Sequence, residues 1–398
     1  MFHRRHILLG FGLAVLVSAA IYVSPWRQSA PRQETLSGRL SDTEFWNLVN
    51  DFSERGGTFR SDNYVSNESA FQHVIPELKR KIKSQGVYLG VGPDQNFTYI
   101  AALRPKIAFI TDIRRRNMLL HLMYKALFEL SENRAEFLSK LFARAMPGAE
   151  LRRPVTTTEA LFQHFNREAA DGKLAEDTLA AILRRLLEYH QFRLAADDTR
   201  TIESVYRAFV AGGPDIRYSP YNQTSWRRFP SYSELMLEND GSGENGDGEN
   251  QSYMASEENF RTVKKLELEN RIVPLVGDFA GDKALRSVAR YLNDHGAAVS
   301  VFYTSNVEFY LFQTEDWKKF FNNVAELPMN PDSVFIRAYF NNNGGLFPNP
   351  PGSSAMPRSV TLLDSMPGLV AAYETGGVRQ YFDVIRRSVP SDDPSRRP

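Results

Sequence analysis

The chain has 398 residues, 42% of them hydrophobic and 24% charged, which is the composition of an ordinary globular protein. A formal net charge of +1 gives no indication of nucleic-acid binding, which requires a basic face or stripe. The absence of cysteine excludes disulfides, cysteine-ligated zinc, iron–sulfur clusters, a thiol nucleophile and a lipid-modified cysteine anchor.

The amino-terminal region predicts a membrane anchor. The basic stretch "MFHRRH" precedes residues 7–23, which carry no charge. Seventeen helical residues span about 26 Å, just short of the roughly 30 Å hydrocarbon core. The alternative is a signal peptide that is cleaved after Ala20. Arginines on both sides of the span leave a slight bias for a cytoplasmic amino terminus, so the rest of the chain is expected outside the inner membrane, or in the periplasm after cleavage.

The pattern of hydrophobic residues divides the rest of the chain. A Ser41 cap with Glu44 three residues later predicts the start of a helix, and a second helix is expected at about 69–83. Short apolar runs predict strands at 87–91, 107–113, 272–279, 298–307, 333–340 and 359–364. One long helix is expected at about 117–145.

This order predicts an α/β fold, a doubly wound, mostly parallel, Rossmann-like sheet with a helical insertion. The expected segments are the anchor or signal peptide (1–26), a tether (27–40), the first part of the sheet domain (41–150), the helical insertion (151–237), a flexible acidic, glycine-rich loop (238–251), the second part of the sheet domain (252–388) and a disordered tail (389–398).

The turn after the first predicted strand suggests a ligand site. Gly90 and Gly92 form this turn, and Asp112 ends the second strand 22 residues after Gly90, a spacing typical of dinucleotide sites. Two departures count against a dinucleotide. Gln95 replaces the third glycine of that motif, and Asp94 would repel a pyrophosphate. An acidic turn suits a ligand without phosphates or one with a positive centre.

With these motifs the chain resembles the class I methyltransferases that use S-adenosylmethionine. "LVGDFAG" and "FYTSNVEFYLF" stand where that family has its third and fourth motifs, although the proline-rich turn common in amino-methylating members is absent. The whole chain also resembles an uncharacterised bacterial family through "SDNYVSNE", "GPDQNFTYI" and "DIRRRN".

The methyltransferase resemblance implies a set of cofactor-binding residues. Gly90, Gly92 and Asp94 would lie near the methionine part, Asp112 near the ribose and Asp278 near the adenine. Asn96 follows the first turn and Asn306 lies in the fourth motif, and both are further candidates. The glycines could instead only relieve steric crowding, Asp112 could cap the next helix or pair with Arg114 or Arg115, Asp278 could cap a helix, and Asn96 could only begin one.

Other candidates surround this core. Glu308 or Tyr310 is a candidate general base. In "SDNYVSNE", either Ser66 or Asn67 caps the following helix, or a second group of residues folds over the site as a lid: Asp62, Asn63, Asn67 and Glu68. Aromatic residues that could form the wall of an acceptor pocket or pack in the core are Trp226, Phe229 and Tyr232.

The functional expectation is therefore an S-adenosylmethionine-binding, methyltransferase-like protein with an unknown acceptor. The alternative is a membrane-anchored binding or scaffolding module that keeps the fold without the activity, which an extracytoplasmic location would favour because this cofactor is cytoplasmic. No spacing of histidines predicts a metal site, and no nucleophile motif supports a hydrolase.

Overall fold

In the described part of the chain, seven strands form one sheet in the order β3-β2-β1-β4-β5-β6-β7. The computed structural model describes residues 36–82, 85–219, 229–243, 248–340 and 359–390. The strands are β1 (Val87–Gly90), β2 (Ile107–Asp112), β3 (Ile272–Val276), β4 (Val299–Ser305), β5 (Met329–Phe340), β6 (Ser359–Ser365) and β7 (Val389–Pro390). β1 to β5 are parallel, and the next two strands each pair antiparallel with their predecessor. The protein is therefore a mixed α/β protein with a mostly parallel sheet.

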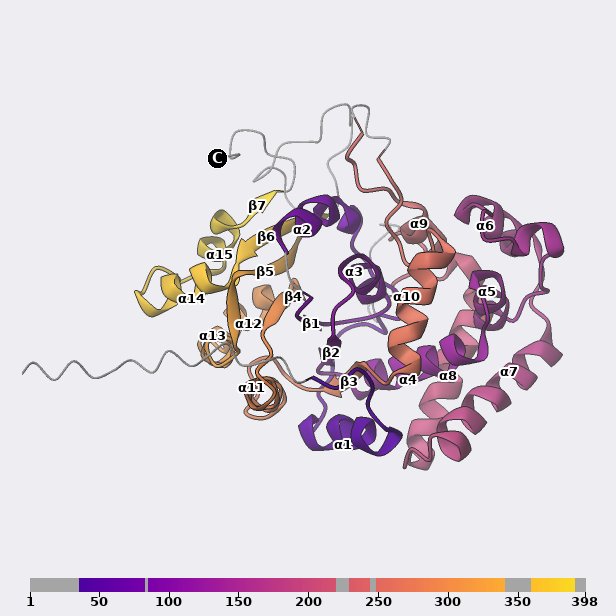
Figure 1. The fold of residues 1–398 in the computed structure, drawn as a ribbon, viewed down its shortest axis with the longest axis horizontal. Coiled ribbons are helices and arrows are strands. Elements are labelled where there is room, and N and C mark those ends of the chain that lie inside the picture. Colours follow the sequence, from indigo (N-terminus) through magenta and orange to yellow (C-terminus); the bar gives the residue numbers. More distant parts are fainter. Residues whose placement is uncertain (1–35, 83–84, 220–228, 244–247, 341–358, 391–398) are drawn as a thin grey trace, which may run out of the picture. The chain divides into compact units, whose positions relative to one another are not determined.

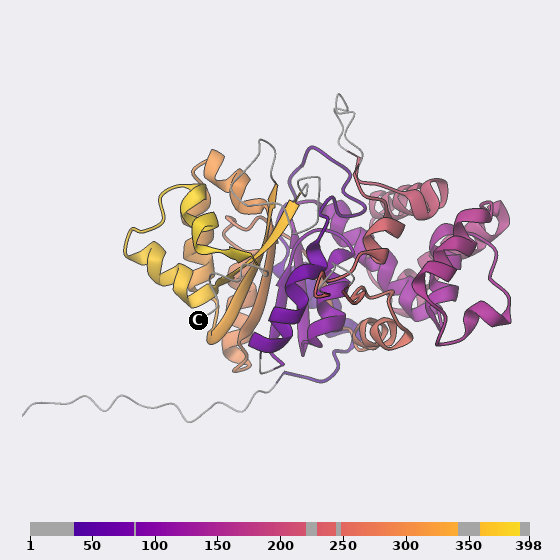
Figure 2. The ribbon, with the colours of Figure 1, turned by 90° about the horizontal axis from the view of Figure 1, so that it is seen from above.

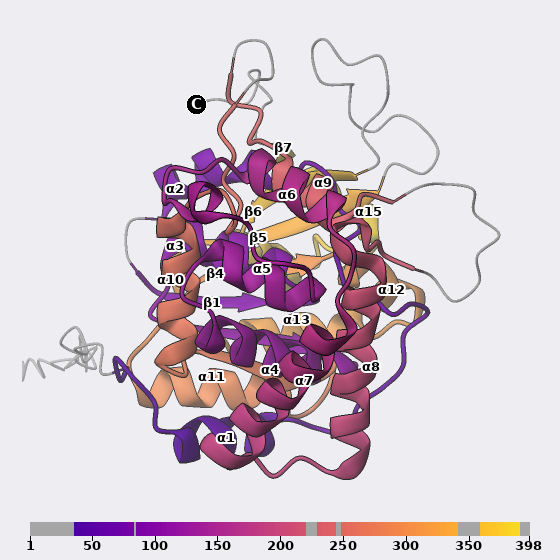
Figure 3. The same cartoon turned by 90° about the vertical axis from the view of Figure 1, so that its right-hand side faces the viewer.

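Helices cover both faces of the sheet. They are α1 (Asp42–Phe52), α2 (Ile75–Lys81), α3 (Gln95–Leu103), α4 (Arg115–Leu130), α5 (Arg134–Phe142), α6 (Thr158–Arg167), α7 (Gly172–Arg184), α8 (Ala196–Gly212), α9 (Tyr232–Leu237), α10 (Glu257–Leu268), α11 (Ala284–Asp294), α12 (Val307–Gln313), α13 (Trp317–Ala325), α14 (Met366–Glu374) and α15 (Tyr381–Arg387). Figures 1 and 3 show α3, α4 and α10 on one face, with α5 to α8 outside them. Figure 2 shows the sheet between this layer and the helices of the opposite face, among them α11 and α13.

The strands form a parallel sheet because they are apolar on both faces. Every residue of β1, β2 and β3 is buried, as expected for strands that are covered by helices on each side. The predicted strands are confirmed in order. β5 starts earlier than expected, at Met329, and β3 and β4 end earlier than expected, at Val276 and Ser305.

The first helix begins as predicted. The Ser41 side chain accepts from the Glu44 amide, and the Glu44 carboxylate accepts from the Ser41 amide, which is a complete capping box. The same region is tied to the residues before β3. The Leu40 amide donates to the Glu269 carbonyl at 3.0 Å, and the Asn270 side chain donates to the Leu40 carbonyl at 3.0 Å.

Two predicted helices differ in the structure. The helix expected at about 117–145 is two helices, because the chain leaves helical geometry at Ser131 and Asn133 caps α5. The helix expected from about residue 69 starts as a short 3₁₀ segment, Phe71–Val74, before α2. Its N-cap is Ala70 and makes no side-chain capping bond, so the prediction that Ser66 or Asn67 caps this helix is wrong.

The tail predicted to be disordered from residue 389 starts too early, because Val389–Pro390 form β7 and pair with β6. Several predicted segments lie outside the described residues, among them the span at 7–23, Trp226 and the rest of the tail, from 391 onwards. Within the described ranges, no helix has both the length and the apolar character needed to cross a membrane.

Candidate functional site

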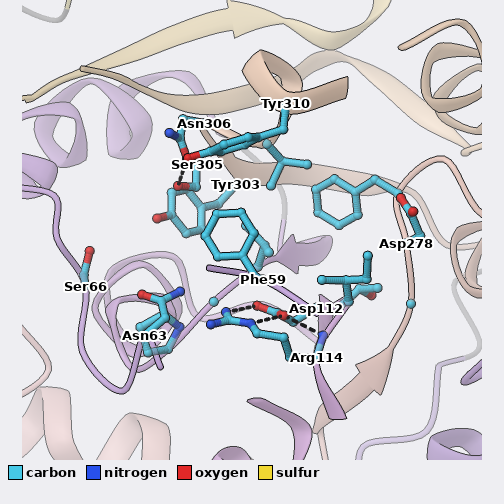
Figure 4. Close-up of a pocket in the computed structure, with 18 of the residues that line it drawn as sticks. Phe59, Asn63, Ser66, Asp112, Arg114, Asp278, Tyr303, Ser305, Asn306 and Tyr310 are labelled. Atoms are coloured by element: carbon cyan, nitrogen blue, oxygen red, sulfur yellow. Dashed lines mark hydrogen bonds and ion pairs between the residues drawn. The ribbon is translucent and has the colours of Figure 1, made fainter. Parts of the chain in front are cut away.

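A cavity lies at the carboxyl ends of four strands (Figure 4). Its volume is about 180 Å³, and its lining includes residues that follow β1, β2, β3 and β4. Chain order reverses between β1 and β4, which are neighbours in the sheet with β2 and β3 on one side and β5 on the other. Ligands in open α/β sheets bind at such a reversal, because the connections leave the sheet toward opposite faces and open a crevice between them.

The loop after α1 crosses the ends of β2 and β3 and reaches into this cavity. The Glu54 amide donates to the Val276 carbonyl at 2.9 Å, and the Gly57 amide donates to the Ile113 carbonyl at 2.7 Å. A Cβ atom at Gly57 would lie 2.7 Å from the Ile113 side chain, so a glycine is needed for this close approach. The loop thus places the Phe59 ring in the middle of the cavity (Figure 4).

Asp112 lines the cavity and is paired with Arg114 (Figure 4). One carboxylate oxygen accepts from the Arg114 amide and Nε, both at 2.9 Å, and the other accepts from an Arg114 Nη at 2.6 Å. The sequence left open whether Asp112 pairs with Arg114 or with Arg115. In the structure Asp112 pairs with Arg114, and Arg115 pairs with Asp198. The Arg114 guanidinium also donates to the Asp62 carbonyl at 3.2 Å and so ties the "SDNYVSNE" segment to the end of β2.

Glu68 forms a buried polar centre on the β4 side of the cavity. Its carboxylate accepts from the Tyr303 hydroxyl at 2.8 Å, from the Gln95 amide at 2.9 Å and from the Ser305 hydroxyl. Burial raises the pKa of Glu68, and these hydrogen bonds oppose the rise. Gln95, which replaces the third glycine of the dinucleotide motif, therefore holds an acid in place instead of making room for phosphates.

Three of the four residues predicted to form a lid lie at the cavity. Asn63, Asn67 and Glu68 line the cavity, but Asp62 does not, because its carboxylate accepts from Arg116. Phe59 belongs to the same cover, and no pattern in the sequence identified it.

One part of the glycine turn lines the cavity, and another part stabilises the turn from the side away from the cavity. Gly92 lines the cavity with φ +79°, a left-handed conformation that favours glycine. Gly90 does not line the cavity. A Cβ atom there would meet the Asn96 side chain at 2.0 Å, so the close packing of Asn96 requires a glycine. The Asn96 amide donates to the carbonyls of Val91 at 3.0 Å and Pro93 at 2.7 Å, and its oxygen accepts from the Tyr88 hydroxyl at 2.8 Å. Gly90 and Asn96 thus shape the turn from behind.

Asp94 also lies behind the turn. Its carboxylate accepts from the Tyr253 hydroxyl at 3.2 Å, and burial raises the pKa of Asp94 to about 7. His121 lies nearby in the core, where its Nε2 is 2.9 Å from the Gly92 carbonyl and burial lowers its pKa to about 4. Neither side chain lines the cavity, so the sequence-based contact between Asp94 and a ligand has no support in this geometry.

Asp278 follows β3 and lines the cavity. Its carboxylate accepts from the Ala280 amide at 2.9 Å, which fixes a local turn. Its backbone amide donates to Glu54 at 2.7 Å. Because α11 begins later, at Ala284 with Lys283 as its N-cap, the alternative that Asp278 caps this helix is wrong.

Glu308 and Tyr310, the two candidate bases, point to different places. Glu308 is buried outside the cavity lining and pairs with Arg337. Its Oε2 accepts from the Arg337 Nε at 2.5 Å, and its Oε1 accepts from the Arg337 Nη2 at 3.1 Å. Tyr310 lines the cavity, where its ring meets the Phe59 ring edge to face at 5.1 Å. Burial raises the pKa of Tyr310, so even less of it is present at neutral pH as the phenolate that could act as a base.

The structure therefore brings together five of the nine predicted residues. Those that line the cavity are Gly92, Asp112, Asp278, Asn306 and Tyr310. Those that lie outside its lining are Gly90, Asp94, Asn96 and Glu308. Among the described residues, no group of three or more His, Asp or Glu side chains is arranged to hold a metal ion.

A family model, described as a domain of unknown function (DUF7790), matches residues 63–168 and 175–358. The two ranges include every residue that lines the cavity except Phe59. A comparison with curated proteins finds no match.

Proposed function

The chain belongs to this family of unknown function, and we propose that it binds S-adenosylmethionine in the cavity as a methyltransferase-like protein. One observation carries the proposal. Gly92, Asp112, Asp278 and Asn306 come from four different strand ends, and all four line the same cavity. The resemblance to class I methyltransferases assigns Gly92, Asp112 and Asp278 to the cofactor, and Asn306 lies in the segment that corresponds to the fourth motif of that family.

The strand order supports a Rossmann-like reading of the fold. Five parallel strands in the order β3-β2-β1-β4-β5, with helices on both faces, correspond to a doubly wound sheet. The antiparallel β6 and β7 extend this sheet at the edge away from β3, and the cavity is unaffected by them.

The residues at the cavity fit parts of this cofactor. A carboxylate has about four acceptor positions, and Asp112 uses three for Arg114, so one position remains for a ribose hydroxyl. Asp278 offers a carboxylate to the adenine amino group. The backbone of Gly92 lies open to the cavity, because the nearest atom to a Cβ there would be 3.8 Å away, on Asn63.

The volume sets a condition on binding. About 180 Å³ is below the roughly 300–1,000 Å³ of pockets for drug-sized ligands. A ligand of the size of S-adenosylmethionine must therefore displace the Phe59 ring, which contacts Tyr310 across the cavity (Figure 4).

When bound, S-adenosylmethionine supplies an electrophilic methyl group. The residues of this chain would act mainly by position: the strand ends hold the cofactor, and the Phe59 loop excludes water from it. Glu308 would take no part as a base, because Arg337 engages both of its carboxylate oxygens.

The test is ligand-induced stabilisation of the full-length chain with S-adenosylmethionine and S-adenosylhomocysteine. A ligand at 100 times its dissociation constant adds about 2.7 kcal/mol, so a rise of a few degrees in melting temperature is expected. Asp278→Asn should reduce this rise, whereas the exposed Asp51→Asn should keep it. Each variant is compared with its own ligand-free melting temperature. The absence of a shift at millimolar ligand in the unsubstituted chain would contradict the proposal.

The buried Glu308–Arg337 pair favours a second candidate function, a binding module without methyl transfer, because it removes the one carboxylate predicted to act as a base. Binding of S-adenosylmethionine without its conversion to S-adenosylhomocysteine in the presence of acceptors would support this module.

A further inference from the structure

A second, larger cavity adjoins the first one and has a volume of about 810 Å³. It lies between α12, the end of β5 and the start of α15. Of the sixteen described residues that line it, ten are aromatic. We call it the aromatic groove. Its volume falls in the range of pockets for drug-sized molecules, roughly 300–1,000 Å³.

The rings of the groove are held in place by one another. Phe312 stacks on Trp317 with ring centroids 4.9 Å apart, and Phe309 meets Tyr381 at 5.5 Å. At the mouth, Phe309 and Phe382 remain 42% and 43% exposed. Each of these two rings packs against Tyr381. Large apolar side chains exposed in one hollow are typical of a binding site, because covering them removes apolar surface from water.

The charges at the groove do not favour a ligand of either sign. The only charged residues in its described lining are Glu315 and Arg379, one of each sign. The Glu315 side chain is 80% exposed and lies 3.6 Å from Lys318, and Arg379 Nε donates to the Gly376 carbonyl at 3.0 Å. A flat, uncharged molecule fits this lining best, since aromatic rings attract other rings in offset or edge-to-face contact.

The groove also meets the cofactor cavity. Asn67, Asn306 and Tyr310 line both of them. A molecule in the groove can therefore reach the boundary at Tyr310, beyond which the proposed cofactor would lie.

From these observations we propose that the aromatic groove binds a small, uncharged aromatic molecule that serves as the methyl acceptor. This step rests on the proposed function. For a hydroxyl acceptor, the bond between the methyl carbon and the sulfonium sulfur breaks, a carbon–oxygen bond forms, the hydroxyl proton passes to solvent and S-adenosylhomocysteine leaves.

The probe for this proposal is 2-naphthol, a neutral aromatic alcohol. Its binding to the full-length chain is measured by equilibrium dialysis, with the same detergent on both sides. The double variant Phe309→Ser/Phe382→Ser should weaken binding at least tenfold. Both side chains are partly exposed, so the fold should tolerate the change. The matched control is Tyr189→Ser/Leu268→Ser, which removes two exposed apolar side chains outside the groove and should leave binding unchanged.

The outcomes separate this inference from the proposed function. Neither Phe309 nor Phe382 lines the cofactor cavity, so the double variant should keep the stabilisation by S-adenosylmethionine. If 2-naphthol binding depends on these rings but no variant responds to the cofactor, the groove binds aromatic molecules and the cofactor proposal falls. If the groove variant and the control bind 2-naphthol equally, or if neither binds it, the inference is overturned. It is also overturned if the groove variant converts a dimer into a monomer in sedimentation, because the groove would then be a subunit interface.

Discussion

At the scale of single residues, the acids near the glycine turn have different environments. Asp112 is engaged by Arg114, Glu68 by three neutral donors and Asp94 by a buried tyrosine hydroxyl. Only the first two line the cavity. The sequence places Asp94 and Asp112 at the ends of the first two strands and Glu68 in the segment before α2, but it does not show which side of the turn each one faces.

Asp94 makes stability depend on pH. Its pKa rises from 3.8 to about 7 on folding because the carboxyl group is buried. The folded state therefore binds more protons than the unfolded state between these values, and this contribution to stability is lost as pH rises from 4 to 7. The difference amounts to roughly 4 kcal/mol.

Asp94→Asn should remove this dependence. We expect the stability of the unsubstituted chain relative to Asp94→Asn to fall between pH 4 and pH 7, as measured by urea unfolding at each pH. His121 acts in the opposite direction, because its lowered pKa makes stability rise over the same range. The comparison with the variant isolates Asp94, and parallel pH profiles for the two proteins would refute the assignment.

Among the residues, the sequence predicted those that lie directly at strand ends. Gly92, Asp112 and Asp278 follow strands that are clear in the apolar pattern, so their meeting at one edge follows from a parallel sheet. Glu308 was misplaced because helical phase decides which way it faces. Within the first turn of α12, Tyr310 faces the cavity, whereas Glu308 faces Arg337 on β5. Glu308 and Arg337 are 29 positions apart in the sequence.

At the scale of elements, the loop between α1 and the "SDNYVSNE" segment is the cover of the site. Its polar, glycine-containing sequence has no periodic pattern, so its place over the ends of β2 and β3 could not be predicted. Backbone hydrogen bonds to Val276 and Ile113 hold it there, and they are specified by the shape of the fold and not by side-chain type.

Gly57→Ala should lift this loop, because the new methyl group would lie 2.7 Å from two carbon atoms of Ile113. Arg55 and Arg60 are exposed in the same loop. We expect trypsin to cleave after them several times faster in the variant, as followed by mass spectrometry of the native protein. Gly38→Ala is the control, since no atom lies within 4 Å of a Cβ there. Equal cleavage rates in the two variants would show that the contact with Ile113 does not hold the loop.

At the scale of the whole molecule, the order of strands and helices was the most predictable feature. Apolar runs and amphipathic patterns predict this order. The break between α4 and α5 depends instead on the few residues between them, where α4 ends at Ser131 and Asn133 caps α5. The antiparallel pairing of β6 with β5 depends on contacts between distant segments and is not visible in the pattern of either strand.

The compartment of the folded part is a prediction at this scale. The charges around residues 7–23 predict that it lies outside the inner membrane, so an alkaline phosphatase fused after Pro398 should be active. That result would favour the binding module, because S-adenosylmethionine is a cytoplasmic molecule. An inactive phosphatase, together with a fluorescent protein that folds at the same position, would contradict the prediction. The folded part would then lie in the cytoplasm, where S-adenosylmethionine is present.

The hydrogen bonds that join Leu40 to Glu269 and Asn270 have a mechanical consequence. A pull on residue 36 first loads these bonds, the start of α1 and the amino end of β3. The cavity lies at the opposite, carboxyl ends of the strands, so such tension bypasses the Phe59 loop. A tether at the amino-terminal end would therefore leave the cavity at the carboxyl ends of the strands unloaded.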